Sequence, residues 1–216
     1  MGILSNILDL FFPPKCVFCG KFLSKGTECL CEKCETELPF MKGAQISQKG
    51  DFYDECVSPL RYEGDVRKSI LRFKFKGATS YADCYGRIMA ECIKENLNGR
   101  FNMITWVPLS TKRARKRGYD QAMLLALAVA LELDDVAVET LEKTANVQAQ
   151  STITDKEMRR ANVSGVYELK DQELIDGKRI LLIDDIVTTG STLSECARVL
   201  LMSGAESVVC ATLARA

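Results

Sequence analysis

The chain has 216 residues, and its 29 Lys and Arg residues balance 29 Asp and Glu residues, so the formal net charge is zero. This length suits one substantial α/β domain with a small appendage. The neutral balance excludes a global field that would draw the whole protein to nucleic acid. No transmembrane segment and no secretory signal are expected, so the sequence predicts a cytoplasmic protein.

Residues 1–50 are expected to form a small N-terminal unit. The apolar residues of its first segment share one face of a predicted short helix: Ile3, Leu4, Ile7, Leu8 and Phe11. This face could dock on the protein's own domain, or it could contact a partner protein or a membrane surface. Both interpretations stay open at this point.

Cysteines cluster in the same unit. The chain has ten cysteines and no histidine, and two matched pairs, Cys16 with Cys19 and Cys31 with Cys34, have the Cys-x-x-Cys spacing. Four thiolates favour a structural Zn²⁺ in a closed tetrahedral site. Cys29 is a spare that could replace Cys31 as a ligand. Free cysteines or a redox dithiol are the alternatives.

Residues 51–216 alternate predicted strands and helices. After a polar boundary at 39–50, strands are expected at 57–62, 103–109, 136–141, 163–169, 180–183 and 207–213, and helices at 65–76, 81–97, 119–133 and from the loop at 188–192 to Gly204. Residues 148–160 are polar and without a clear pattern. This order predicts an α/β fold with a mainly parallel sheet flanked by helices.

The most specific motif follows the strand at 180–183. Asp184 and Asp185 come at its end, where open α/β sheets bind ligands. The next loop offers hydroxyls, backbone N–H groups and a glycine, a combination typical of phosphate binding: Thr188, Thr189, Gly190, Ser191 and Thr192. Phosphate in the loop, with carboxylates nearby for ribose hydroxyls or Mg²⁺, indicates a phosphorylated sugar. Neither a Walker A motif nor a Gly-x-Gly-x-x-Gly motif is present.

A basic run follows the strand at 103–109. Ser110 and Thr111 are succeeded by residues 112–117, of which five are Lys or Arg. These cations could bind pyrophosphate, or they could follow a DNA or RNA backbone without base specificity. A solvated surface is the third interpretation.

The run at 180–194 resembles the phosphoribosyl-pyrophosphate (PRPP) signature of type I phosphoribosyltransferases. Nearly the whole chain resembles the ComF family of competence proteins, through the cysteine pairs, that signature and six further matches: Tyr62-Glu-Gly64, Lys74-Phe-Lys-Gly77, Val107-Pro-Leu-Ser110, Arg117-Gly-Tyr-Asp-Gln121, Gln150 and Arg159-Arg-Ala-Asn162. The resemblance implies a zinc ribbon at 1–50 joined to a type I phosphoribosyltransferase-like domain at 51–216. It also implies a part in single-stranded DNA uptake beside a competence helicase.

Residue roles also follow from this resemblance. Asp184 and Asp185 would hold the ribose hydroxyls and Mg²⁺, and Thr188 to Thr192 would surround the 5′-phosphate of PRPP. Ser110 and Thr111 would begin the pyrophosphate loop, and Arg159 would close over pyrophosphate as part of a lid. The family's usual Arg-Gly-Phe-Asn-Gln reads Arg-Gly-Tyr-Asp-Gln here, which adds the carboxylate of Asp120 near the expected polyanion site.

Two classes of function remain open from the sequence. One is a protein with a PRPP site that acts in DNA uptake by handling single-stranded DNA. The other is an active phosphoribosyltransferase with an unknown acceptor. No residues identify that acceptor, and without histidine a general base would have to be a carboxylate or the metal-bound leaving group.

Overall fold

A computed structural model of the chain describes residues 13–24, 27, 29–144 and 165–216. The apolar helical face predicted within residues 1–12, the matches at Gln150 and 159–162, and the polar segment at 148–160 lie outside the described residues. Arg159, the expected lid cation, is among them. None of the described helices has the length and apolar character that crossing a bilayer requires.

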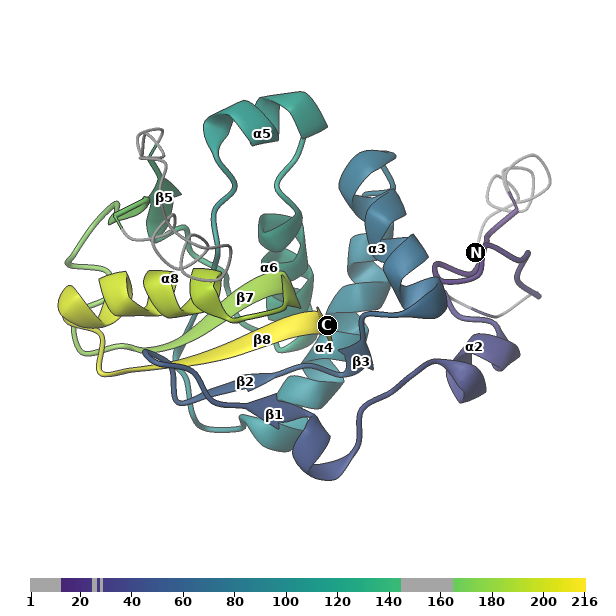
Figure 1. Cartoon of the computed structure of the whole chain (residues 1–216), viewed down its shortest axis with the longest axis horizontal. Coiled ribbons are helices and arrows are strands. Elements are labelled where there is room, and N and C mark those ends of the chain that lie inside the picture. Colours follow the sequence, from purple (N-terminus) through teal and green to yellow (C-terminus); the bar gives the residue numbers. More distant parts are fainter. Residues whose placement is uncertain (1–12, 25–26, 28, 145–164) are drawn as a thin grey trace, which may run out of the picture.

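A mainly parallel sheet forms the centre of the molecule (Figure 1). Its strands run in the order β1 (Ser47–Gln48), β2 (Glu55–Val57), β8 (Ser207–Arg215), β7 (Arg179–Val187) and β4 (Met103–Trp106), and β3 (Leu60–Arg61) also pairs with β8. Only the β1–β2 pairing in this sheet is antiparallel. The predicted α/β class with a mainly parallel sheet is confirmed.

Helices cover both faces of this sheet. The first face carries α3 (Gly64–Phe75), α4 (Tyr81–Asn96) and α6 (Gln121–Glu132), and the second carries α8 (Ser191–Met202). Along β7, Leu181 and Ile183 pack in the first core, whereas Ile180 and Leu182 pack in the second. Side chains of a strand alternate between its faces, which explains why an uninterrupted aliphatic run forms a strand buried on both sides.

Three local predictions need correction. The strand expected at 57–62 is interrupted at Ser58–Pro59, because proline has no N–H for the ladder. The strand expected at 136–141 is reduced to one bridge between Ala137 and Ile104. Its end, β5 (Leu141–Lys143), pairs instead with β6 (Tyr167–Leu169) in a separate antiparallel sheet. The basic run, for which no helix was predicted, forms α5 (Thr111–Arg117).

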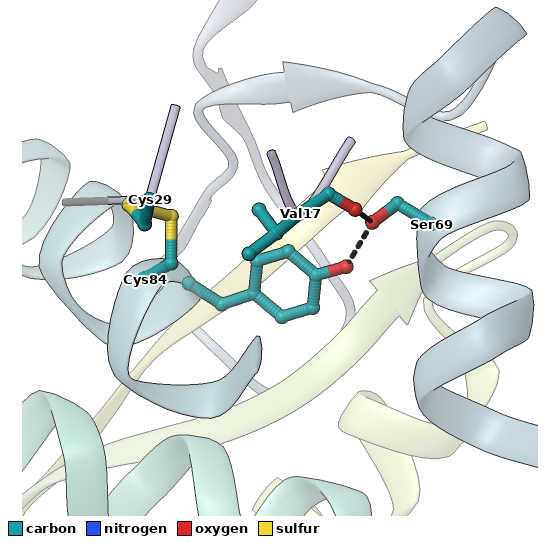
Figure 2. The surroundings of a disulfide bond; sticks show 5 residues. Val17, Cys29, Ser69 and Cys84 are labelled. Carbon is teal, nitrogen blue, oxygen red and sulfur yellow. Dashed lines mark hydrogen bonds between the residues drawn. A yellow bond between two sulfur atoms is a disulfide. The ribbon is translucent and has the colours of Figure 1, made fainter. Parts of the chain in front are cut away.

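Polar contacts attach the turn between Cys16 and Cys19, here called the first cysteine knuckle, to helix α3. The Arg72 guanidinium donates to the carbonyls of Val17 and Phe18, at 2.8 and 2.6 Å. Ser69 also donates to Val17 O and lies 2.5 Å from the hydroxyl of Tyr85 (Figure 2). Two side chains of α3 therefore satisfy backbone carbonyls next to Cys16 and Cys19 that would otherwise be buried without partners, and Tyr85 of α4 hydrogen-bonds with one of them, Ser69.

The chain between the knuckles and the sheet contains two short helices. They are α2 (Glu32–Glu37), which begins directly after Cys31, and η1 (Gly43–Gln45). Ser47 and Gln48 of β1 already belong to the sheet. The division of the chain at residue 50 stays a prediction.

Candidate functional site

Strand length decides where the two aspartates lie. β7 does not end at Ile183 as predicted but continues to Val187. Its neighbour β4 stops at Trp106, opposite Ile183, so beyond that point β7 pairs only with β8. Asp184 and Asp185 therefore lie where one neighbouring strand has ended, at the carboxyl edge of the sheet.

The two carboxylates have different surroundings. Asp185 Oδ2 lies 2.8 Å from Lys74 Nζ of α3, and the two side chains are only 12% and 19% exposed. Asp184 lines a cavity of about 40 Å³ together with the loop that follows β7. Because successive strand residues point to opposite faces, one carboxylate is paired with a lysine and the other is directed to the loop.

The charge of Asp184 is disfavoured in this position. Burial, reinforced by the neighbouring charge of Asp185, raises the pKa of the Asp184 carboxyl to about 8, against a smaller opposing effect of Lys74. The backbone N–H of Asp185 donates to Asp184 Oδ1 at 2.8 Å. A carboxyl with this pKa can hold or release a proton near neutral pH, as a general acid or base must.

The predicted phosphate loop leads into α8, and its last two residues, Ser191 and Thr192, form the beginning of that helix. Thr189 Oγ1 and Ser191 Oγ lie 2.8 Å apart, and Gly190 has φ +76°, a left-handed conformation that favours glycine. A Cβ atom at Gly190 would also lie 2.6 Å from the hydroxyl of Tyr53. All five predicted loop residues line the 40 Å³ cavity: Thr188, Thr189, Gly190, Ser191 and Thr192.

Ser110 and Thr111 lie at the amino end of α5, of which Thr111 is the first residue. Ser110 is the N-cap residue of this helix, and its carbonyl accepts from Ala114 N at 2.9 Å. None of the α5 cations forms an ion pair with a residue that the structure describes. The cations are Lys112, Arg113, Arg115, Lys116 and Arg117. Their charge is therefore available to an anionic ligand.

Asp120, the departure from the family pattern, has structural contacts. Its Oδ2 accepts from Leu109 N at 2.6 Å, and its Oδ1 accepts from Met123 N at 3.2 Å as the N-cap of α6. Burial raises the pKa of Asp120, and these backbone hydrogen bonds oppose that shift. The carboxylate thus holds the two ends of the loop that carries α5.

Two lysines of the site escaped assignment from the sequence. Lys74 lay in a matched family motif but had no role there. Lys143 of β5 donates to the Tyr167 hydroxyl at 2.8 Å, and burial together with the charge of Arg113 lowers its pKa. The motif at 74–77 marked Lys74 without indicating its contact with Asp185, and Lys143 has no local sequence signal; both approach the aspartates only through folding.

The four cysteines of the two pairs come together as predicted. Their sulfur atoms all lie within 4.8 Å of one another: Cys16, Cys19, Cys31 and Cys34. Burial raises the pKa of the Cys16 thiol, but backbone hydrogen bonds from Cys19 and Cys31 outweigh it and lower the pKa to about 7. Four sulfurs at this spacing fit a tetrahedral Zn²⁺.

Cys29 is bonded elsewhere. It forms a disulfide with Cys84 of α4, with the Cα atoms 5.9 Å apart (Figure 2). The spare cysteine is thus a second connection between the cysteine-rich segment and α4, and the geometry leaves Cys31 in the sulfur cluster.

Two family models match the chain. A phosphoribosyl transferase domain matches residues 115–216, and a double zinc ribbon domain matches residues 7–51. Together with the sulfur cluster, the second match supports structural zinc.

Named relatives are similar over most of the chain. Competence protein ComFC of Bacillus subtilis is 26% identical over 93% of this chain and 77% of its own. Competence protein F of Haemophilus influenzae is 26% identical over 95% of this chain and 99% of its own. DNA utilization protein YhgH of Escherichia coli K12 is 27% identical over 92% of this chain and 90% of its own.

Proposed function

We propose that this chain acts in DNA uptake, because it is similar over most of its length to named competence proteins and matches a phosphoribosyl transferase domain and a double zinc ribbon domain. We further propose that it carries a PRPP or phosphoribosyl site and handles single-stranded DNA, in the cytoplasm and beside a competence helicase. The observation that carries the proposal is the grouping, at one edge of the sheet, of the loop predicted to bind phosphate, the two aspartates and the α5 cations, which form no ion pair with a described residue.

Charge complementarity supports the PRPP site. The loop at 188–192 lines a cavity with Asp184, so a 5′-phosphate there would place ribose hydroxyls near a carboxylate. Asp184 and Asp185 would take the hydroxyls and Mg²⁺, which prefers oxygen ligands. Ser110 and Thr111 would begin the pyrophosphate site, and Arg159 would close it.

The relatives' names and α5 support the DNA role. Two relatives are named competence proteins and a third a DNA utilization protein. The chain as a whole is neutral, so its attraction to nucleic acid would have to be local. The five cations of α5 provide such a local positive surface.

An active phosphoribosyltransferase is the second candidate function. Asp184 favours it, because a carboxyl with a pKa of about 8 beside the phosphate loop suits a general acid or base. Displacement at the ribose anomeric carbon otherwise needs positioning and electrostatic stabilisation, which the loop and the α5 cations would supply.

Thermal shift with PRPP and Mg²⁺ tests the proposed pocket. PRPP at a hundred times its Kd stabilises the protein by about 2.7 kcal/mol. Asp185→Asn with Thr189→Ala should abolish the shift relative to the variant's own ligand-free melting temperature, which loss of the Lys74 contact lowers. Glu173→Ala is the control, at an exposed position before the amino end of β7, the end of the strand opposite the loop. A full shift in the double variant would refute the site. Pyrophosphate release with candidate acceptors, run beside single-stranded DNA binding, then separates the two functions.

A further inference from the structure

An exposed aromatic ring ends α3 beside the basic helix. Phe75 is 63% exposed, and the Arg117 guanidinium lies 4.9 Å from the centre of its ring. Tyr119, just beyond α5, donates from its hydroxyl to Phe73 O of α3. The end of α3 and the end of α5 are therefore held together, with one face of an aromatic ring on the surface between them.

The position of Phe75 links this ring to the acid pair. Its chain neighbour Lys74 makes the 2.8 Å contact with Asp185. In Figure 1, the upper end of α3 and the whole of α5 stand on the same side of the sheet. Phe75 therefore directly follows the residue that contacts the acid pair, and its own ring contacts Arg117 of α5.

A fully buried phenylalanine stabilises the fold by about 1.5–3 kcal/mol, and an exposed one does not make this contribution. Phe75 is the last residue of its helix, and it lies on a different face from Phe73, which is fully buried in the core. Packing therefore does not account for an aromatic residue at Phe75. An aromatic face next to phosphate-binding cations is the combination by which proteins hold single-stranded nucleic acid.

We propose that Phe75, with Arg117 against its ring, is a base-stacking site for a single strand of nucleic acid whose phosphates follow the α5 cations. This inference rests on the proposed function and deepens it by naming a contact to a base. Stacking accepts any base, because every base has a π face. The site would therefore hold a strand without reading its sequence.

Binding of a fluorescent oligothymidylate to the full chain tests this site. Phe75→Leu keeps an apolar side chain but loses the aromatic face, and it should weaken binding by about 5- to 150-fold. Phe75→Trp should retain the wild-type affinity. The log–log salt slope should be the same in all three proteins, because no charge has changed. Phe52→Ala, an aromatic residue 42% exposed before the amino end of β2, is the matched control.

An abasic oligonucleotide provides the second arm. If the ring stacks on a base, wild type and Phe75→Leu should bind the abasic strand equally. Equal affinity of wild type and Phe75→Leu for oligothymidylate would overturn the stacking site while leaving the DNA role intact. Failure of the wild type to bind any strand would instead contradict the DNA role itself. A loss in Phe75→Leu that persists with the abasic strand would also overturn base stacking.

Discussion

Lys74 Nζ lies 2.8 Å from Asp185 Oδ2 and joins the C-terminal part of α3 to the carboxyl edge of the sheet. Both side chains are nearly buried, so each charge has lost much of its hydration. The attraction between the two charges compensates for that loss. The same contact places the end of α3, with Phe75, next to the acid pair. One ion pair therefore connects the proposed ribose site to the surface of Phe75 and α5 that is proposed to bind single-stranded nucleic acid.

Removing one partner of this pair should destabilise the fold. Lys74→Met leaves the carboxylate of Asp185 uncompensated, and breaking a buried pair in this way costs about 3–5 kcal/mol. Lys74→Met combined with Asp185→Asn should recover most of the loss. Urea unfolding of the single and double variants measures both values, and additive losses would show that the two residues are not coupled.

Stability should fall as the pH rises from about 4 to about 8. The folded-state pKa of Asp184 is about 8, above the unfolded value of about 3.9, so in this window the folded protein binds the proton more tightly. The free energy of unfolding then decreases with pH, by at most about 1.4 kcal/mol per unit from this group. Asp184→Asn should remove this component when unfolding is measured across the window. An unchanged pH profile would contradict the raised pKa.

Gly190→Ala tests the contact beneath the phosphate loop. The new Cβ would lie 2.6 Å from the Tyr53 hydroxyl in addition to the strain of φ +76°. Gly118→Ala is a matched control, since Gly118 has φ +83° and open space around a Cβ. The control should cost about 1–2 kcal/mol, and Gly190→Ala more. Adding Tyr53→Phe should remove the additional cost of Gly190→Ala, because the nearest remaining ring atom, Cζ, lies 3.7 Å from the new Cβ. Equal costs at both glycines would refute a close approach.

The cysteine cluster should hold a stoichiometric zinc ion. Cys31→Ser removes one of four sulfurs that lie within 4.8 Å of one another, and the purified variant should lose its zinc and much of the ribbon's stability. Cys29→Ser, which breaks only the disulfide with Cys84, should keep the metal. Metal analysis of the two variants, purified without added zinc, decides whether Cys31 or Cys29 is the fourth ligand. The reverse result would make Cys29 the ligand.

The α5 cations should determine how strongly salt weakens the binding of single-stranded DNA. Each phosphate contact contributes about −0.7 to the log–log slope for single strands. Changing Arg113, Arg115 and Arg117 together to Ala should flatten the slope by about two units if all three contact phosphates. Loss of the PRPP-induced thermal shift with unchanged DNA affinity would assign the cations to pyrophosphate. If both affinities survive, α5 is a solvated surface.

Local patterns in the sequence were enough for the α/β class and for the cysteine cluster. A run of aliphatic residues at 180–183 indicates a strand buried on both faces, and paired Cys-x-x-Cys spacing predicts four sulfurs close enough for zinc. These features depend on residues near one another in the chain. The same is true of the loop at 188–192, because its glycine and hydroxyl side chains predict phosphate binding without any knowledge of the fold.

Only the tertiary structure decided which partners these groups have. Lys74 reaches Asp185 across 110 intervening residues, and the Tyr53 hydroxyl lies close to Gly190, 137 positions further along the chain. Cys29 pairs with Cys84, and the Asp120 carboxylate accepts from Leu109 N on the far side of α5. No local pattern predicts such contacts, because they arise from the packing of helices and strands that are distant in sequence. The pKa of Asp184 belongs with them, since burial and neighbouring charges set it.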